Sequence, residues 1–174
     1  MTPAVQKQVP LLNLRAQHKV IRDEVMAAIT RVVDSQKFIL GEDVSKLEEE
    51  IAAYSGAKYA VGCASGSDAL FLALLALEIG PGDEVLTTPY TFFATAGAIS
   101  RIGAVPVFVD VEEETFNLDV NLAAKTLAAH PRIRALMPVH LFGGCADMEP
   151  ICEMARERDI PVIEDAAQSI GSDS

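Results

Sequence analysis

The stretch GPGDEVLTTPYTFFATAGAISRIGAVPVFVD, residues 80–110, contains two short apolar runs separated by a segment of helical length. Residues 84–88 and 105–109 have the apolar, β-branched character of strands, and residues 93–102 are interpreted as the helix between them. Gly103 follows that helix, where a glycine at a helix C-terminus is expected. A strand, a crossover helix and a second strand together predict two parallel strands of one sheet.

The same alternation continues on both sides of this stretch. It predicts further strands at residues 59–62, 135–139 and 161–164, and further helices at residues 68–77, 120–129 and 148–158. Five strands separated by crossover helices predict an α/β fold, with a mainly parallel sheet and helices on both faces. Nearer the N-terminus, apolar residues at steps of three and four predict an amphipathic helix at 15–35, and a second helix is expected at 42–54.

Length and composition restrict the class of function. The chain has 174 residues, of which 50% are hydrophobic and 22% charged, and this is typical of one globular domain. Its 14 Lys and Arg residues stand against 25 Asp and Glu residues, for a net charge of −11. Such a charge repels phosphate backbones and anionic lipids, so neither a nucleic acid nor a membrane surface is an expected partner.

The cysteines and histidines indicate neither disulfides nor a metal site. The three cysteines are odd in number and form no C-x-x-C pair, and the three histidines form no H-x-x-x-H pair. No apolar run is long enough to span a bilayer, and the first ten residues lack the apolar centre of a secretion signal. We therefore expect a protein of the reducing cytoplasm that binds no metal.

Ligands of parallel sheets collect beyond the carboxyl ends of the strands, and small residues follow the first predicted strand there. In residues 63–70, backbone N–H groups and the hydroxyls of Ser65 and Ser67 lie at the start of a helix, which favours a bound phosphate. The alternative is an ordinary helix cap formed by Ser67 or Asp68.

Aromatic, basic and acidic residues follow three other strands. Residues 88–95 contain three aromatic side chains, of which one is expected to stack on a flat ring while two pack into the core. His140 follows the fourth strand and is assigned a structural role. Asp165 ends the fifth strand, where a carboxylate needs a cationic partner. That partner is either an arginine such as Arg134 or a protonated heterocycle.

The chain resembles the DegT/DnrJ/StrS family of pyridoxal 5′-phosphate-dependent sugar aminotransferases, which have the aspartate-aminotransferase fold. Six motifs keep their order and spacing from about residue 10 onward. They are FILG (38–41), ASGSDAL (64–70), GPGDEV (80–85), TFFAT (91–95), PVHLFG (138–143) and VIEDAAQ (162–168).

The resemblance implies a role for five residues in binding pyridoxal 5′-phosphate. Gly66 and Ser67 match the pair that binds the phosphate, and Phe92 matches the aromatic that stacks on the pyridine ring. Asp165 matches the carboxylate that keeps the pyridine nitrogen protonated, and Gln168 matches the residue near the phenolic oxygen. The implied reaction moves an amino group from glutamate to a nucleotide-linked keto sugar, in a homodimer with shared active sites.

The lysine that forms the Schiff base in this family is not found among the motifs. None of the six lysines follows Asp165, so we expect that lysine beyond Ser174 and assign no catalytic residue to this chain, which by itself is expected to be inactive. Residues 1–41 are expected to form a helical and dimer-contact segment, and residues 42–174 the first part of the cofactor-binding large domain. The last strands of that domain, and the small C-terminal domain, are then absent.

Two other functions remain open from the sequence. Relatives that carry His in place of the lysine dehydrate keto sugars, and this chain is alternatively such a sugar dehydratase. The third possibility is a non-catalytic binding or regulatory half-domain.

Overall fold

Three short strands form a parallel sheet in the computed structural model, which describes residues 9–10 and 12–172. The strands are β1 (Glu84–Thr87), β2 (Val105–Phe108) and β3 (Ile133–Leu136), in the spatial order β2-β1-β3. Residues 161–165 run parallel beside β3 and its continuation, through the bridges Leu136–Val162 and Val139–Asp165. The predicted parallel sheet is confirmed.

Six α-helices accompany these strands in the described part of the chain. They are α1 (Leu14–Ser35), α2 (Glu42–Ser55), α3 (Gly66–Ala76), α4 (Ala94–Arg101), α5 (Val120–Ala129) and α6 (Met148–Arg158). The helix that the sequence predicts between the first two strands of its opening stretch is α4. It ends as expected, because Gly103 adopts φ +81°, a left-handed conformation that favours glycine.

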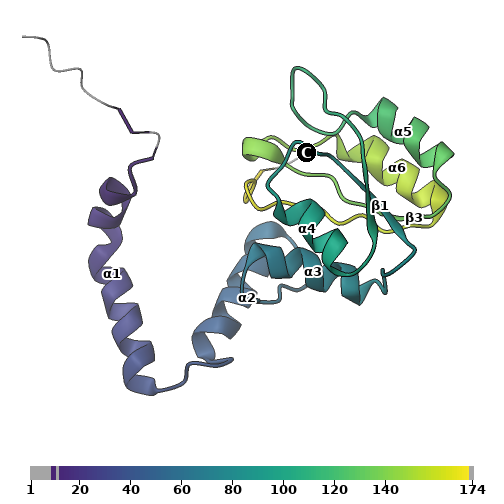
Figure 1. Cartoon of the computed structure of the whole chain (residues 1–174). Helices are drawn as coiled ribbons and strands as arrows, with labels where there is room; N and C mark the ends of the chain where they lie inside the picture. Colours follow the sequence, from purple (N-terminus) through teal and green to yellow (C-terminus); the bar gives the residue numbers. More distant parts are fainter. Residues whose placement is uncertain (1–8, 11, 173–174) are drawn as a thin grey trace, which may run out of the picture.

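Helices cover both faces of the sheet, as predicted. Successive side chains of a strand point to opposite faces, so Val85 packs among buried residues of α3 and α4, whereas Leu86 packs among those of α5 and α6. Figure 1 shows α5 and α6 together on one side and α3 and α4 on the other. The carboxyl ends of the parallel strands consequently meet at one edge of the sheet.

The prediction of a strand at residues 59–62 is wrong. Tyr59 and Val61 are 74% and 83% exposed, and no other segment of the described residues pairs with this one. A strand needs a neighbour for its backbone groups, so apolar character alone does not form one. The strand predicted at residues 135–139 is β3, which begins two residues earlier, at Ile133. Residues 161–164, also predicted as a strand, pair through isolated bridges only.

Helix α1 makes no buried contact with the sheet. None of its residues is buried, although Val20, Ile29 and Val33 are apolar. Figure 1 shows it standing apart from the rest of the chain, joined to α2 by residues 36–41. Among the described helices, none combines the length and the apolar character that crossing a membrane requires. Residues 1–8, 11 and 173–174, which the predicted segments 1–41 and 42–174 include, lie outside the described residues.

A buried carboxylate with two exposed partners lies at the amino end of β1. The carboxylate of Glu84 accepts a 2.6 Å hydrogen bond from the Arg132 guanidinium and lies 3.1 Å from Nδ1 of His130. Burial raises the pKa of Glu84, but the hydrogen bonds and charge interactions with His130 and Arg132 together lower it by more, so the net pKa lies below the ordinary value. This end of the sheet is opposite to the ligand edge and serves stability.

We predict that the stability contributed by Glu84 depends on pH. In the unfolded chain a glutamate titrates near about 4.3, and the folded pKa is lower, so the contribution is complete above the unfolded value and disappears as the pH falls through the folded one. Urea unfolding of the parent and of Glu84→Gln should give free energies that differ at pH 7 and converge toward pH 3. The exposed Glu153→Gln is the control, and a Glu84 difference that stays constant with pH contradicts this account.

Candidate functional site

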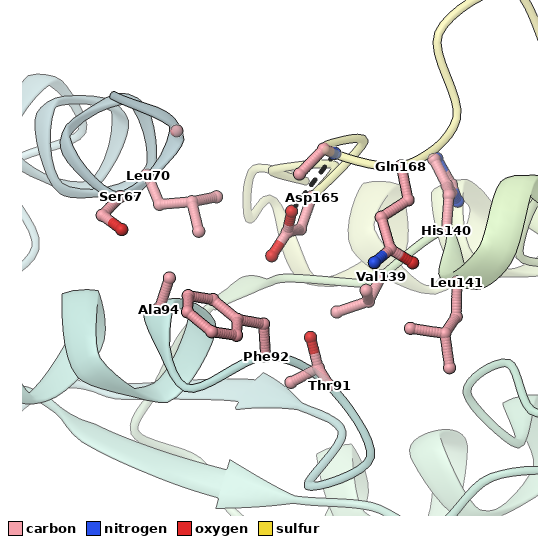
Figure 2. A pocket seen from close by; sticks show the side chains of 12 residues that line it. Ser67, Leu70, Thr91, Phe92, Ala94, Val139, His140, Leu141, Asp165 and Gln168 are labelled. Atoms are coloured by element: carbon pink, nitrogen blue, oxygen red, sulfur yellow. Dashed lines mark hydrogen bonds between the residues drawn. The ribbon is translucent and has the colours of Figure 1, made fainter. Parts of the chain in front are cut away.

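A cavity of about 330 Å³ lies beyond the carboxyl ends of β1 and β3, within the size range of small-molecule sites. Residues from α3, from the turn after β1, from the continuation of β3 and from the segment after Asp165 form its wall (Figure 2). All five residues that the resemblance implies for the cofactor line this one cavity: Gly66, Ser67, Phe92, Asp165 and Gln168.

The N-terminus of α3 forms one end of the cavity. Ser65 is the N-cap residue, because its Oγ accepts a 3.2 Å hydrogen bond from the N–H of Asp68. The prediction that Ser67 or Asp68 forms the cap is therefore wrong. The amides of Gly66 and Ser67 have no acceptor within the helix, and apart from the adjoining residues and the helix backbone no atom lies within 4 Å of where a Cβ on Gly66 would be. This open, positive helix end suits a phosphate.

Asp165 brings a buried carboxylate to the opposite wall. Its side chain is 7% exposed, and its Oδ2 accepts a 2.7 Å hydrogen bond from the Thr95 hydroxyl. Its Oδ1 receives only a long contact of 3.4 Å from the N–H of Ala167, drawn as the dashed line in Figure 2. Within residues 9–10 and 12–172, no lysine, arginine or histidine pairs with this carboxylate, and Arg134 is exposed. The alternative of an ion pair with Arg134 therefore fails.

Gln168 directs a hydrogen-bond donor into the cavity. Its Oε1 accepts a 3.0 Å hydrogen bond from the N–H of Phe142. An amide whose oxygen is held in this way presents its nitrogen to other partners. Figure 2 shows that nitrogen on the cavity side of the side chain.

Phe92 lies across the cavity from Asp165. Its ring is 75% exposed, although it lines the cavity, and Figure 2 shows it beside Ala94 with Ser67 and Gln168 on either side. The prediction that the other two aromatics pack into the core is wrong. Tyr90 is 47% exposed and its ring is tilted by 32° against that of Phe116, with the centroids 5.7 Å apart, and Phe93 is 80% exposed.

Two further side chains hold the wall in place. His140 is buried, with Nδ1 accepting from the N–H of Ala146 at 3.0 Å and Nε2 lying 2.9 Å from Glu164. The first contact makes Nε2 the protonated nitrogen, so neither nitrogen is free toward the cavity. Thr95, which fixes Asp165 in the wall, is not among the residues predicted from the sequence. The only signal for it is a pair of threonines four residues apart, Thr91 and Thr95, at the start of a helix.

Together these groups define an α/β protein with a small-molecule site at the carboxyl edge of a parallel sheet. The site combines a positive helix end, an exposed aromatic face, an amide donor and a buried carboxylate with no paired cation in the described residues. It therefore suits a flat ligand that carries both an anionic group and a proton on its ring.

Comparisons with known proteins agree with this class. The model of the DegT/DnrJ/EryC1/StrS aminotransferase family matches residues 19–174. A pleiotropic regulatory protein of Geobacillus stearothermophilus is 51% identical over 164 residues, which are 94% of this chain and 44% of that protein. The UDP-N-acetyl-3-dehydro-alpha-D-glucosamine 3-aminotransferase of Acidithiobacillus ferrooxidans is 48% identical over the same shares of both chains.

Solved structures give the same result. DesV of S. venezuelae superposes with a TM-score of 0.91 at 46% identity, over 95% of this chain and 44% of that one. NtdA of Bacillus subtilis, solved with bound cofactor PMP, superposes with a TM-score of 0.90 at 32% identity, over 98% of this chain and 39% of that one. The chain belongs to the DegT/DnrJ/EryC1/StrS aminotransferase family, and it spans about 44% of the length of the curated relatives that it matches.

The geometry at the start of α3 predicts that two neighbouring serines differ in their effect on stability. Ser65→Ala removes the cap and should lower the free energy of unfolding by about 1 kcal/mol. Ser67→Ala removes no hydrogen bond of the described chain and should change it by less than about 0.5 kcal/mol. Urea unfolding at pH 7 measures both. An equal loss in the two variants would mean that Ser67 shares the capping role.

Proposed function

We propose that this chain forms the cofactor-binding part of a pyridoxal 5′-phosphate-dependent aminotransferase, which transfers an amino group from glutamate to a nucleotide-linked keto sugar. One observation carries the proposal. Five residues from three separate motifs line a single cavity, and each offers the chemistry that one part of this cofactor requires.

The fit of the cofactor follows from its donor and acceptor groups. The amides of Gly66 and Ser67 and the Ser67 hydroxyl would hold the phosphate, and Phe92 would stack on the pyridine ring. The amide nitrogen of Gln168 would donate to the phenolic oxygen, and the carboxylate of Asp165 would accept from the protonated ring nitrogen. A cationic ring gives the carboxylate the partner that the described residues do not provide.

When bound, pyridoxal 5′-phosphate supplies an electron sink for the carbon next to the transferred amino group. The residues of this chain contribute binding and orientation. Asp165 holds the proton on the ring nitrogen, the helix end of α3 fixes the phosphate, and Phe92 and Gln168 set the plane of the ring.

The family and one relative favour transamination over the other two functions. The family is described as an aminotransferase family, and the relative from Acidithiobacillus ferrooxidans is named as an aminotransferase that acts on a UDP-sugar. We therefore prefer a nucleotide-linked keto sugar as substrate to the sugar dehydration or the non-catalytic role. Free thiols at Cys63, Cys145 and Cys152 support a reducing cytoplasm as the compartment.

A second copy of the chain is the partner that we propose for the N-terminal segment. Val20, Ile29 and Val33 of α1 are exposed. The loop residues Phe38, Ile39 and Leu40 are also exposed, at 60% to 88%. Apolar surface of this kind is typical of an interface. We assign this segment to the contact in a homodimer, and residues from 42 onward to the large domain.

Pyridoxal 5′-phosphate titration tests the site directly. Ser67→Ala should raise the dissociation constant about 10- to 100-fold, because it removes a hydrogen bond to a charged group. Phe92→Leu should raise it about 2- to 10-fold through lost stacking. Phe93→Leu, at a ring that is outside the cavity wall, is the matched control. If all three variants bind like the parent, the assignment of Ser67 and Phe92 fails.

We also predict that the 174-residue chain does not transaminate by itself. No lysine is among the described residues that line the cavity, and Lys7 lies outside the described residues. The reaction needs a positioned lysine amine. Incubation with pyridoxal 5′-phosphate, reduction with borohydride and peptide mapping should give no stoichiometric label at one lysine, and glutamate should not be consumed. A single labelled lysine together with glutamate turnover contradicts the prediction.

A further inference from the structure

Thr95 is a fully buried threonine at the start of α4, and it contacts the carboxylate of Asp165. Its hydroxyl donates to Oδ2 of Asp165 at 2.7 Å, joining residues 70 positions apart in the sequence. The Thr91 hydroxyl lies 3.0 Å from the Thr95 hydroxyl. Thr95 has one proton, which it gives to Asp165, so Thr91 must be the donor of that second bond. The result is a directed chain from Thr91 through Thr95 to Asp165.

This chain of hydrogen bonds makes the two oxygens of Asp165 unequal. Oδ2 is held by Thr95, whereas Oδ1 has only the 3.4 Å contact from the N–H of Ala167. The χ2 torsion of an aspartate is broad and roughly two-fold, so without Thr95 only the 3.4 Å contact from Ala167 would restrain the orientation of the carboxylate by hydrogen bonding. With Thr95 in place, Oδ1 remains available to a ligand in the cavity.

Thr95 itself is not part of the cavity wall. The lining residues include its neighbours Phe92 and Ala94 and its partner Asp165, but Thr95 is not among them. An effect of Thr95 on a ligand is therefore indirect, through the two residues that its hydroxyl contacts, Asp165 and Thr91, which both line the cavity.

We propose that Thr95 is a positioning residue, which orients Asp165 so that one carboxylate oxygen meets the ring nitrogen of the cofactor. This inference rests on the proposed function. It adds a residue from α4 to the site. The orientation of Asp165 then depends on a helix that lies 70 residues away in the sequence. Replacing the hydroxyl by a methyl group should therefore weaken recognition of the ring nitrogen and leave recognition of the phosphate intact.

The test compares two ligands that differ at one atom. Pyridoxal 5′-phosphate and its 1-deaza analogue, in which carbon replaces the ring nitrogen, are titrated against the parent, Thr95→Val and Thr95→Ser by equilibrium dialysis. Thr95→Val keeps the shape without the hydroxyl, and we expect it to bind pyridoxal 5′-phosphate about tenfold more weakly and the deaza analogue within about twofold of the parent. Thr95→Ser keeps the hydroxyl and should bind both ligands with the dissociation constants of the parent.

The outcomes separate this inference from the proposed function. A Thr95→Val chain that loses affinity equally for both ligands, or for neither, overturns the role of Thr95. A parent chain that does not prefer pyridoxal 5′-phosphate over the deaza analogue counts against Asp165 as the partner of the ring nitrogen, and so against the proposed function itself.

A measurement without cofactor covers the case in which Thr95→Val does not fold. In the parent chain, the Thr95 hydroxyl proton should exchange with water slowly enough to be seen by NMR, because it is buried and bound to Asp165. Asp165→Asn should shift or remove the hydroxyl signal, whereas the exposed Asp147→Asn should leave it unchanged. A rapidly exchanging hydroxyl proton in the parent overturns the proposal.

Discussion

The pairing of residues 161–165 with the continuation of β3 is the constraint on which the site depends. The N–H of Asp165 donates to the carbonyl of Pro138 at 2.9 Å, and the N–H of His140 donates to the carbonyl of Asp165 at 3.1 Å. Together with the Thr95 hydroxyl bond, these contacts fix both the backbone and the side chain of Asp165. A parallel sheet places this carboxylate at the same edge as the turn after β1, and hence opposite Phe92.

The two edges of the sheet use charge differently. At the amino end, Glu84 is paired with the Arg132 guanidinium and contacts the imidazole of His130, and it stabilises the fold. At the carboxyl end, Asp165 receives hydroxyl and amide donors but no cation of the described chain. A buried carboxylate without a paired charge is costly, and proteins keep such groups where a ligand completes them. This difference supports the proposed ligand site at the carboxyl edge.

The sequence motifs and the alternation of strands and helices predict most of the fold. The features that they do not predict depend on contacts between particular residues. The helices at 120–129 and 148–158 agree residue for residue with α5 and α6, since apolar spacing and flanking acidic residues mark their bounds. The stretch 59–62 was mispredicted because a strand depends on a partner that its own residues do not specify. Similarly, Ser65 rather than Ser67 caps α3, and Thr95 escaped notice because its partner lies 70 residues away. The five cofactor residues were named through a family resemblance, and only the folded chain shows that they share a cavity.

A crystal structure of this chain with pyridoxal 5′-phosphate tests the central claim most directly. The account predicts the phosphate at the amides of Gly66 and Ser67, the ring over Phe92, and the ring nitrogen within hydrogen-bonding distance of Oδ1 of Asp165, with Thr95 still bound to Oδ2. A cofactor bound in the reverse orientation, with its phosphate away from α3, or bound outside this cavity, would contradict the account.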